Sequence, residues 1–221
     1  MHLTPGKERT TLETETTARF FGARVGTTRT RTEMDTATGL PRNYVSYNSK
    51  RARRFTFEKE GYRFERLRPD PKKRTAPLSE WPIRSSDHFA YPVDSDGQRL
   101  PVYDHYGMIL HLRNTDLTNV GDELVVHVAT SHGPTAYRIR VSEVRAAPLQ
   151  YRTLPGNQKQ KTVVREMRLQ VVPEDSELAE GFMNMKGETE LWVEANSKTL
   201  LRIGGHAPKI GKVTLVLAGM G

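Results

Sequence analysis

The chain has 221 residues and no cysteine, and that absence removes several kinds of chemistry at once. Without cysteine there is no disulfide framework, no thiolate nucleophile and no cysteine-ligated metal site. The sequence also lacks a run of 18 apolar residues, so no segment is typical of a transmembrane helix. The first 20 residues lack the apolar stretch of a secretory signal peptide. We therefore expect either a cytosolic protein or a chain that starts after a removed signal peptide.

Sequence motifs for catalysis are missing as well. There is no G-x-S-x-G turn for a serine nucleophile and no H-E-x-x-H pattern for zinc. His105 and His111 lie six residues apart on a predicted helix, hence on different faces, and we expect no structural metal among the seven histidines. Gly204-Gly205 and Gly211 fall between strand-like segments and not before a helix, so they cannot cradle a phosphate. The sequence therefore predicts a protein that is not an enzyme and carries no cofactor.

What the sequence does contain is β-strand patterning, most clearly in residues 186–221. Short alternations of apolar and polar residues, such as Thr189–Glu194 and Lys212–Leu217, are separated by turn residues at Asn196-Ser197 and Gly204-Gly205. Only 36% of the residues are hydrophobic and 27% are charged, which suits antiparallel sheets that leave one face to water. The pattern predicts a mainly β protein.

The predicted architecture is a single domain over residues 18–221, built on a strongly curved antiparallel sheet that forms a sandwich or a partly closed barrel. Residues 1–17 are polar, and we expect a flexible N-terminal segment or an edge strand there. One principal helix is expected over Val102–Asn114, packed on the concave side of the sheet. Gly107 inside it costs about 1 kcal/mol relative to alanine, which indicates a close neighbour. The proline-rich residues 69–101 are predicted to form a long loop that acts as a lid or wrapping segment.

A cleft between the curved sheet and this helix is the first candidate binding site. In one interpretation Asp104 and Arg113 form the polar wall of the cleft. In the other, Asp104 at the start of the helix and Arg113 at its end complement the helix dipole. The residues predicted to bind a ligand are Asp104, Tyr106, Leu110, Arg113 and Trp192.

A β-hairpin is predicted around the two-residue turn Glu60-Gly61. Phe55 and Phe57 project from one face of its first strand, and Tyr62 and Phe64 face them from the second strand. Since neighbouring side chains alternate between faces, the arginines between these rings are expected to point to the opposite face.

The same hairpin concentrates the positive charge of the chain. Eleven basic and four acidic residues between Lys50 and Arg74 carry +7 of the net +8. Such a field neutralises phosphates while aromatic rings stack on bases, so nucleic-acid or polyanion binding is the alternative function. Two other interpretations stay open: a solvated sheet face, favoured by the interrupting glutamates, and contact with anionic lipid or polysaccharide. The residues predicted for polyanion binding are Arg51, Arg53, Arg54, Arg63 and Arg66.

Three stretches carry a family resemblance. They are Tyr103-Asp104-x4-Ile109-Leu110-x-Leu112-Arg113 followed by Gly121-Asp122, the ending from Leu191-Trp192-Val193 to Gly211-Lys212-Val213-Thr214-Leu215, and the early Met34-Asp35-x3-Gly39-Leu40-Pro41. In their order and spacing, over roughly residues 18–217, they resemble an uncharacterised family of bacterial exported proteins, domain of unknown function 3108.

The resemblance implies a periplasmic or otherwise exported β-rich protein with no established catalytic activity, whose native form begins with a signal peptide. We therefore expect a noncatalytic cell-envelope protein. Its cleft would bind either an apolar or lipid-like ligand or an envelope partner protein. A cytoplasmic location is the alternative, and nucleic acid is the less favoured partner.

Overall fold

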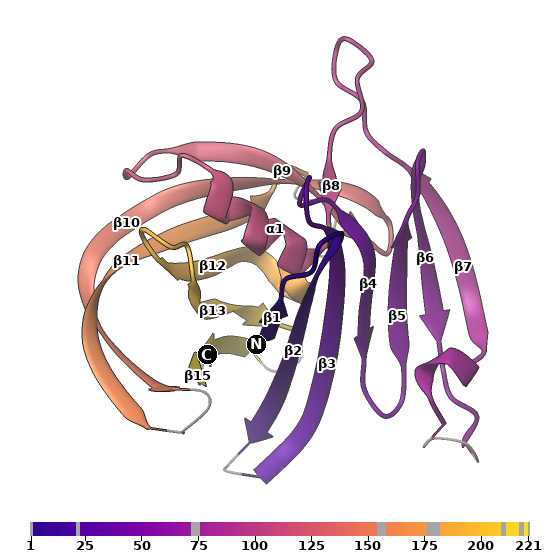
Figure 1. Ribbon diagram of the computed structural model, residues 1–221, viewed down its shortest axis with the longest axis horizontal. Helices are drawn as coiled ribbons and strands as arrows, with labels where there is room; N and C mark the ends of the chain where they lie inside the picture. Colours follow the sequence, from indigo (N-terminus) through magenta and orange to yellow (C-terminus); the bar gives the residue numbers. More distant parts are fainter. Residues whose placement is uncertain are drawn as a thin grey trace. The chain divides into compact units, whose positions relative to one another are not determined.

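The computed structural model describes residues 2–20, 23–71, 76–153, 158–175, 182–208, 211–216 and 219–220. The chain divides into two compact units, one of residues 1–107 with 131–134 and one of residues 108–130 with 135–221 (Figure 1). Within the described residues, no helix is both long and apolar enough to cross a membrane.

The first unit contains a seven-stranded antiparallel meander, in which each strand pairs with the next along the chain. Threonine dominates β2 and β3, and its branched side chain favours extended backbone. The unit also holds the short 3₁₀ helix η2 (Leu78–Glu80) and β8 (Val102–Tyr103). The seven strands are β1 (His2–Thr4), β2 (Arg9–Phe20), β3 (Ala23–Asp35), β4 (Pro41–Tyr47), β5 (Ala52–Phe57), β6 (Gly61–Leu67) and β7 (Ile83–Ala90).

The second unit contains a sheet in the order β14-β13-β12-β11-β10-β9, with β15 parallel to the end of β10. Figure 1 shows that β10 and β11 are long and strongly bent. Helix α1 (His105–His111), whose residues from 108 on belong to this unit, continues into the 3₁₀ helix η3 (Leu112–Asn114), and η4 (Phe182–Asn184) precedes β12. The strands are β9 (Glu123–Thr130), β10 (Gly133–Thr153), β11 (Lys159–Pro173), β12 (Lys186–Glu194), β13 (Leu200–Ala207), β14 (Gly211–Val216) and β15 (Gly219–Met220).

The predicted fold class is confirmed, because the chain is mainly β, its sheets are open, and His105–Asn114 form one principal helical segment. The described strands belong to two sheets rather than to one. Residues 2–4 and 9–17, expected as a flexible segment or an edge strand, lie in β1 and β2. The predicted boundary at residue 18 stays a prediction.

Two predicted element boundaries were wrong. The helix begins at His105 and not at Val102, because Val102 and Tyr103 form β8 and the side chain of Asp104 caps the first turn. Residues 69–101 are not one long loop, since Ile83–Ala90 pairs along β6 as strand β7. The strand was not predicted because the residues around it are rich in proline, although β7 itself contains none.

One face of the first sheet carries an aromatic core. The register places Phe55 opposite Phe64, with ring centroids 4.9 Å apart, and Phe57 opposite Tyr62, at 5.8 Å. The predicted hairpin and its cross-strand ring pairs are therefore confirmed. Arg63, between Tyr62 and Phe64, points to the opposite face as predicted, whereas Arg66, beyond the rings, lies on the aromatic face with its guanidinium 5.3 Å from the Phe64 ring centroid.

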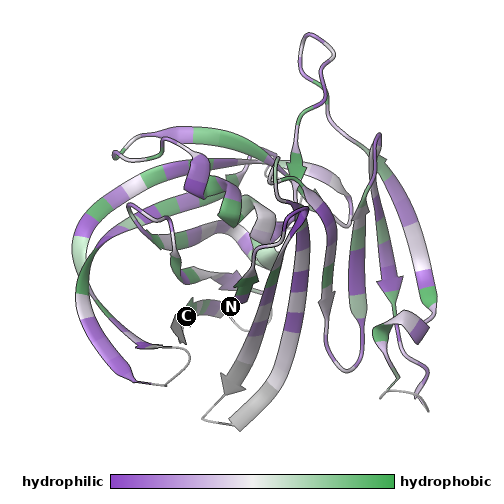
Figure 2. Cartoon of the chain, in the orientation of Figure 1, coloured by the Kyte–Doolittle hydropathy of each residue, from purple (hydrophilic) through white to green (hydrophobic). Residues whose placement is uncertain are grey.

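The core of the second sheet is aliphatic. Cross-strand neighbours in one row on β10 to β14 are all apolar, and only the edge residue Leu215 is half-exposed. Figure 2 shows polar and apolar residues following one another along the long strands β10 and β11, as a two-faced sheet requires. The row consists of Val141, Leu169, Leu191, Ile203 and Leu215.

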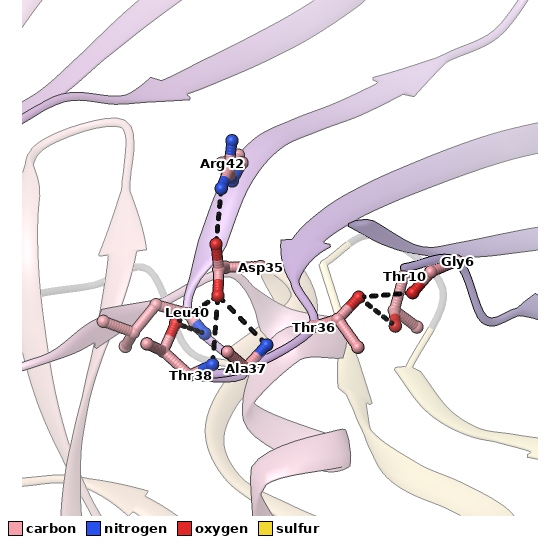
Figure 3. A network of polar contacts seen from close by, with 8 residues as sticks. All are labelled: Gly6, Thr10, Asp35, Thr36, Ala37, Thr38, Leu40 and Arg42. Carbon is pink, nitrogen blue, oxygen red and sulfur yellow. Dashed lines mark hydrogen bonds and ion pairs between the residues drawn. The ribbon is translucent and has the colours of Figure 1, made fainter. Parts of the chain in front are cut away.

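The turn between β3 and β4 is held by Asp35 (Figure 3). Its Oδ1 accepts hydrogen bonds from the backbone N–H groups of Ala37 and Thr38 at 3.1 and 3.0 Å, and its Oδ2 pairs with Arg42. The hydrogen bond from Arg42, followed by the one from the backbone N–H of Thr38, lowers the pKa of Asp35 to about 2. Asp35 of the proposed family pattern thus has a structural role, that of fixing the register of β3 and β4.

Candidate functional site

A groove of about 1010 Å³ lies on the first unit. Its lining comes from β1 to β4, from the Asn48 and Ser49 loop that follows β4, and from the segment Ala76–Trp81. The volume is at the upper end of the range for small-molecule sites, about 300–1,000 Å³. The groove is therefore large enough to hold a ligand.

One row of side chains runs across the floor of this groove. The register aligns Glu15 of β2 with Arg29 of β3, and Arg29 with Tyr47 of β4, so all three side chains lie on one face. The same row continues as Ala52 on β5 and Leu67 on β6, both buried. Along this row the surface changes from charged to apolar.

A second row, two residues away on each strand, has the same order over β2 to β4 but continues on β5 and β6 as the ion pair of Arg54 with Glu65. Glu13 of β2 is aligned with Arg31 of β3, and Arg31 with Val45 of β4. Arg31 pairs with Glu13 at 3.8 Å and with Glu33 at 2.9 Å. The groove thus has a charged side on β2 and β3 and an apolar side on β4.

The charges on the groove floor are balanced. Arg29 donates from Nε to Oε2 of Glu15 at 2.9 Å, and this hydrogen bond, with a smaller contribution from Tyr47, raises the pKa of the Arg29 guanidinium. Glu13, Glu15, Arg29 and Arg31 are each about half exposed. Ion pairs this exposed contribute about 0–1 kcal/mol to folding, so their stabilising role is small.

The apolar wall of the groove belongs to a small separate core. Trp81 is 7% exposed, and its Nε1–H donates to the carbonyl oxygen of Ala76 at 3.1 Å, which holds the segment Ala76–Trp81 in a turn. Because the indole N–H is satisfied inside that turn, the ring contributes only apolar surface. The cluster consists of Ala52, Leu67 and Trp81, with Tyr47 and Leu78 packed against it.

Asp104, one of the predicted ligand residues, is a helix cap in the interior of the first unit. The side chain is 1% exposed, and Oδ1 accepts hydrogen bonds from Thr32 Oγ1 at 3.0 Å and from the N–H groups of Tyr106 and Gly107 at 2.9 and 3.1 Å. Burial, only partly offset by these donors, raises the pKa of Asp104 to about 6. This arrangement agrees with the structural interpretation of Asp104, since capping satisfies the first N–H groups of the helix.

The second oxygen of the Asp104 carboxylate explains why residue 107 is a glycine. Oδ2 of Asp104 is buried without a hydrogen-bond partner among the described residues. A Cβ atom at Gly107 would lie 2.9 Å from that oxygen, closer than ordinary contact. The close neighbour predicted for Gly107 is therefore the Asp104 carboxylate.

The other predicted ligand residues are distributed over both units. Tyr106 is buried in the first unit, with its ring centroid 6.5 Å from that of Tyr44. Leu110 is half-buried and Arg113 is exposed, and both belong to the second unit. No single unit contains the whole predicted set, which stays a prediction.

Trp192 lies on the polar face of the second sheet, since its neighbours Leu191 and Val193 point into the core. The guanidinium carbons of Arg168 and Arg202 lie 5.8 and 4.9 Å from its ring centroid. Ion pairs neutralise both cations, Arg168 with Glu190 and Arg202 with Glu166. A Cβ atom at Gly204 would meet the Trp192 ring at 2.8 Å, so the ring packs closely over the next strand.

The residues predicted for polyanion binding do not form one free basic surface. Arg54 pairs with Glu65 at 2.6 Å, and Arg63 pairs with Glu58 at 2.5 Å. These two arginines lie on the face opposite Arg53 and Arg66, because their positions alternate along β5 and β6. Arg51 is exposed in the loop before β5, and residues 72–74 of the basic segment lie outside the described residues.

Sequence reasoning missed the groove residues. The signal was present, because glutamates alternate with threonines in β2 and arginines alternate with threonines in β3. Charged residues with a period of two on paired strands indicate a sheet face with matched ion pairs.

No group of His, Asp and Glu side chains suited to a metal ion occurs in the described part of the chain. No protein-family model, curated protein or solved structure matches this sequence.

Proposed function

We propose that this protein is a noncatalytic cell-envelope protein that binds a small amphipathic ligand in the groove of its first unit. The observation that carries the proposal is the groove of about 1010 Å³ with a charged side on β2 and β3 and an apolar side formed by β4 and Trp81. Ligand sites combine apolar surface with a few placed polar groups in this way. The envelope location rests on the resemblance to exported proteins.

Polyanion binding is less well supported than this ligand-binding role. The ion pairs of Arg54 with Glu65 and of Arg63 with Glu58 cancel part of the positive field. A phosphate backbone binds through cations that are free to replace its counterions. A neutralised sheet face offers few of them.

Native mass spectrometry of protein purified gently from its own host tests the proposal. We expect the wild-type protein to carry an additional mass, and Ser49→Trp to lose it, since Ser49 lines the groove and is exposed. Ser95→Trp is the matched control, because Ser95 is exposed in a turn of the same unit and does not line the groove. A wild-type protein without any adduct, or an adduct that survives in Ser49→Trp, would contradict the proposal.

A further inference from the structure

We propose that the groove binds a neutral oligosaccharide, an inference that rests on the ligand-binding function proposed above. The groove is built as a polar floor next to an aromatic wall, and that combination matches a sugar ring. A pyranose presents C–H groups on one face and hydroxyl groups around its rim. Across β2, β3 and β4 the floor of the groove passes from charged side chains, which suit hydroxyl groups, to apolar side chains, which suit C–H groups.

The polar side of the groove suits hydroxyl groups. A guanidinium has more N–H donors, and a carboxylate more acceptor sites, than a single ion pair uses. A hydroxyl group donates and accepts at the same time, so it fits between an arginine and a glutamate that lie side by side. The pairs Glu15 with Arg29 and Glu13 with Arg31 therefore offer two successive sites for hydroxyl pairs, and hydrogen bonds to charged groups are the stronger kind.

The apolar side of the groove suits the C–H face of a sugar. Tyr47 follows Arg29 in the first row, and Val45 follows Arg31 in the second. Tyr47 is half-buried against the cluster that contains Trp81, so its ring is held in place before any ligand arrives. A fixed aromatic ring gives contact area at little cost in conformational entropy.

The charge balance of the floor argues against two other ligand classes. Two glutamates face two arginines, so the groove has no excess of cations for a polyanion. A lipid chain would take four charged side chains out of water without giving them further hydrogen bonds, and removing charged groups from water costs free energy even when they are paired. A neutral ligand with many hydroxyl groups meets neither penalty.

An array of bacterial surface oligosaccharides, probed with the full chain, tests the inference. We expect the wild-type protein to bind neutral glycans and Arg29→Gln to lose about tenfold in affinity, since a hydrogen bond from a charged group is removed. Arg138→Gln is the matched control, because Arg138 is also about half exposed and also pairs with glutamates, but lies in the second unit. Binding should change little between about 0.05 and 0.5 M salt, in contrast to polyanion binding.

The outcomes separate this inference from the proposed function. If no glycan binds while the native protein carries a lipid or peptide that Ser49→Trp releases, the oligosaccharide inference is wrong and the groove function stands. Binding restricted to anionic glycans, with steep salt dependence, also contradicts the inference. Absence of both glycan binding and a native adduct overturns both proposals. Circular dichroism of Arg29→Gln checks that the loss is not unfolding, and Ser49→Trp on the same array provides a second, steric block.

Discussion

The two faces of the first sheet are built from the same strands and are chemically opposite. One face carries Tyr44, Tyr62 and Phe64, which are buried among other aromatic rings. The other face carries the Glu15–Arg29 and Glu13–Arg31 pairs, which stay about half exposed at the groove. Strand alternation makes this possible, since each strand contributes every second residue to each face.

The two faces differ in how much their side chains contribute to the stability of the fold. Apolar burial stabilises by roughly 25 cal/mol per Å² removed from water, so the buried rings of the aromatic face contribute more to folding than the exposed ion pairs of the groove do. Exposed ion pairs contribute about 0–1 kcal/mol. The ion-paired residues of the groove face can therefore be replaced at little cost to folding, and substitutions on the two faces should have different effects on stability.

The largest expected difference comes from truncating one side chain on each face. Phe64→Ala removes a fully buried ring and should lower the free energy of unfolding by about 3–5 kcal/mol. Arg31→Ala on the groove face should lower it by less than about 1 kcal/mol. Urea unfolding at neutral pH measures both values. Similar losses in the two variants would remove the distinction between the faces.

The buried carboxylate on the aromatic side should make stability depend on pH. Because the pKa of Asp104 is raised to about 6 in the folded protein, from 3.8, the folded state binds its proton more tightly. The contribution of Asp104 to the free energy of unfolding is therefore largest below pH 3.8. It falls by about 3 kcal/mol as the pH rises through 6.

Asp104→Asn isolates that effect from the other carboxylates. The asparagine keeps an oxygen for the N–H groups of Tyr106 and Gly107 but does not ionise. The difference in unfolding free energy between the two proteins should move in favour of Asp104→Asn as the pH is raised from about 4 to 7. Parallel pH profiles for the two proteins would show that Asp104 is not perturbed.

A smaller effect is expected at Gly107. Alanine is the better helix former, yet its Cβ atom would lie 2.9 Å from Oδ2 of Asp104 and displace the capping carboxylate. We expect Gly107→Ala to cost about 1–2 kcal/mol, the usual value of a lost cap. In the background of Asp104→Ala the same substitution should become neutral or stabilising. A thermal unfolding double-mutant cycle measures this coupling, and additive effects would contradict it.

The sequence allowed the local β patterns to be predicted but not the site. The ring pairs around Glu60-Gly61 and the close neighbour of Gly107 depend on residues near in sequence, so both could be predicted from it. The groove joins Glu15, Arg29 and Tyr47 to Trp81, which are brought together only by strand register and by the turn before β7. The start of α1 depends on Thr32 as well as on Asp104, a contact across 72 residues.

Fluorescence of a protein with one tryptophan tests the central claim most directly. Trp81 and Trp192 are the two tryptophans of the chain, so Trp192→Phe leaves a single reporter in the wall of the groove. Titration with the glycan that binds best on the array should change Trp81 emission saturably, with an affinity that matches calorimetry. The same titration of Trp192→Phe/Arg29→Gln should need about tenfold more glycan. Calorimetric binding with no change in Trp81 emission and no effect of Arg29→Gln would place the ligand elsewhere and contradict the account.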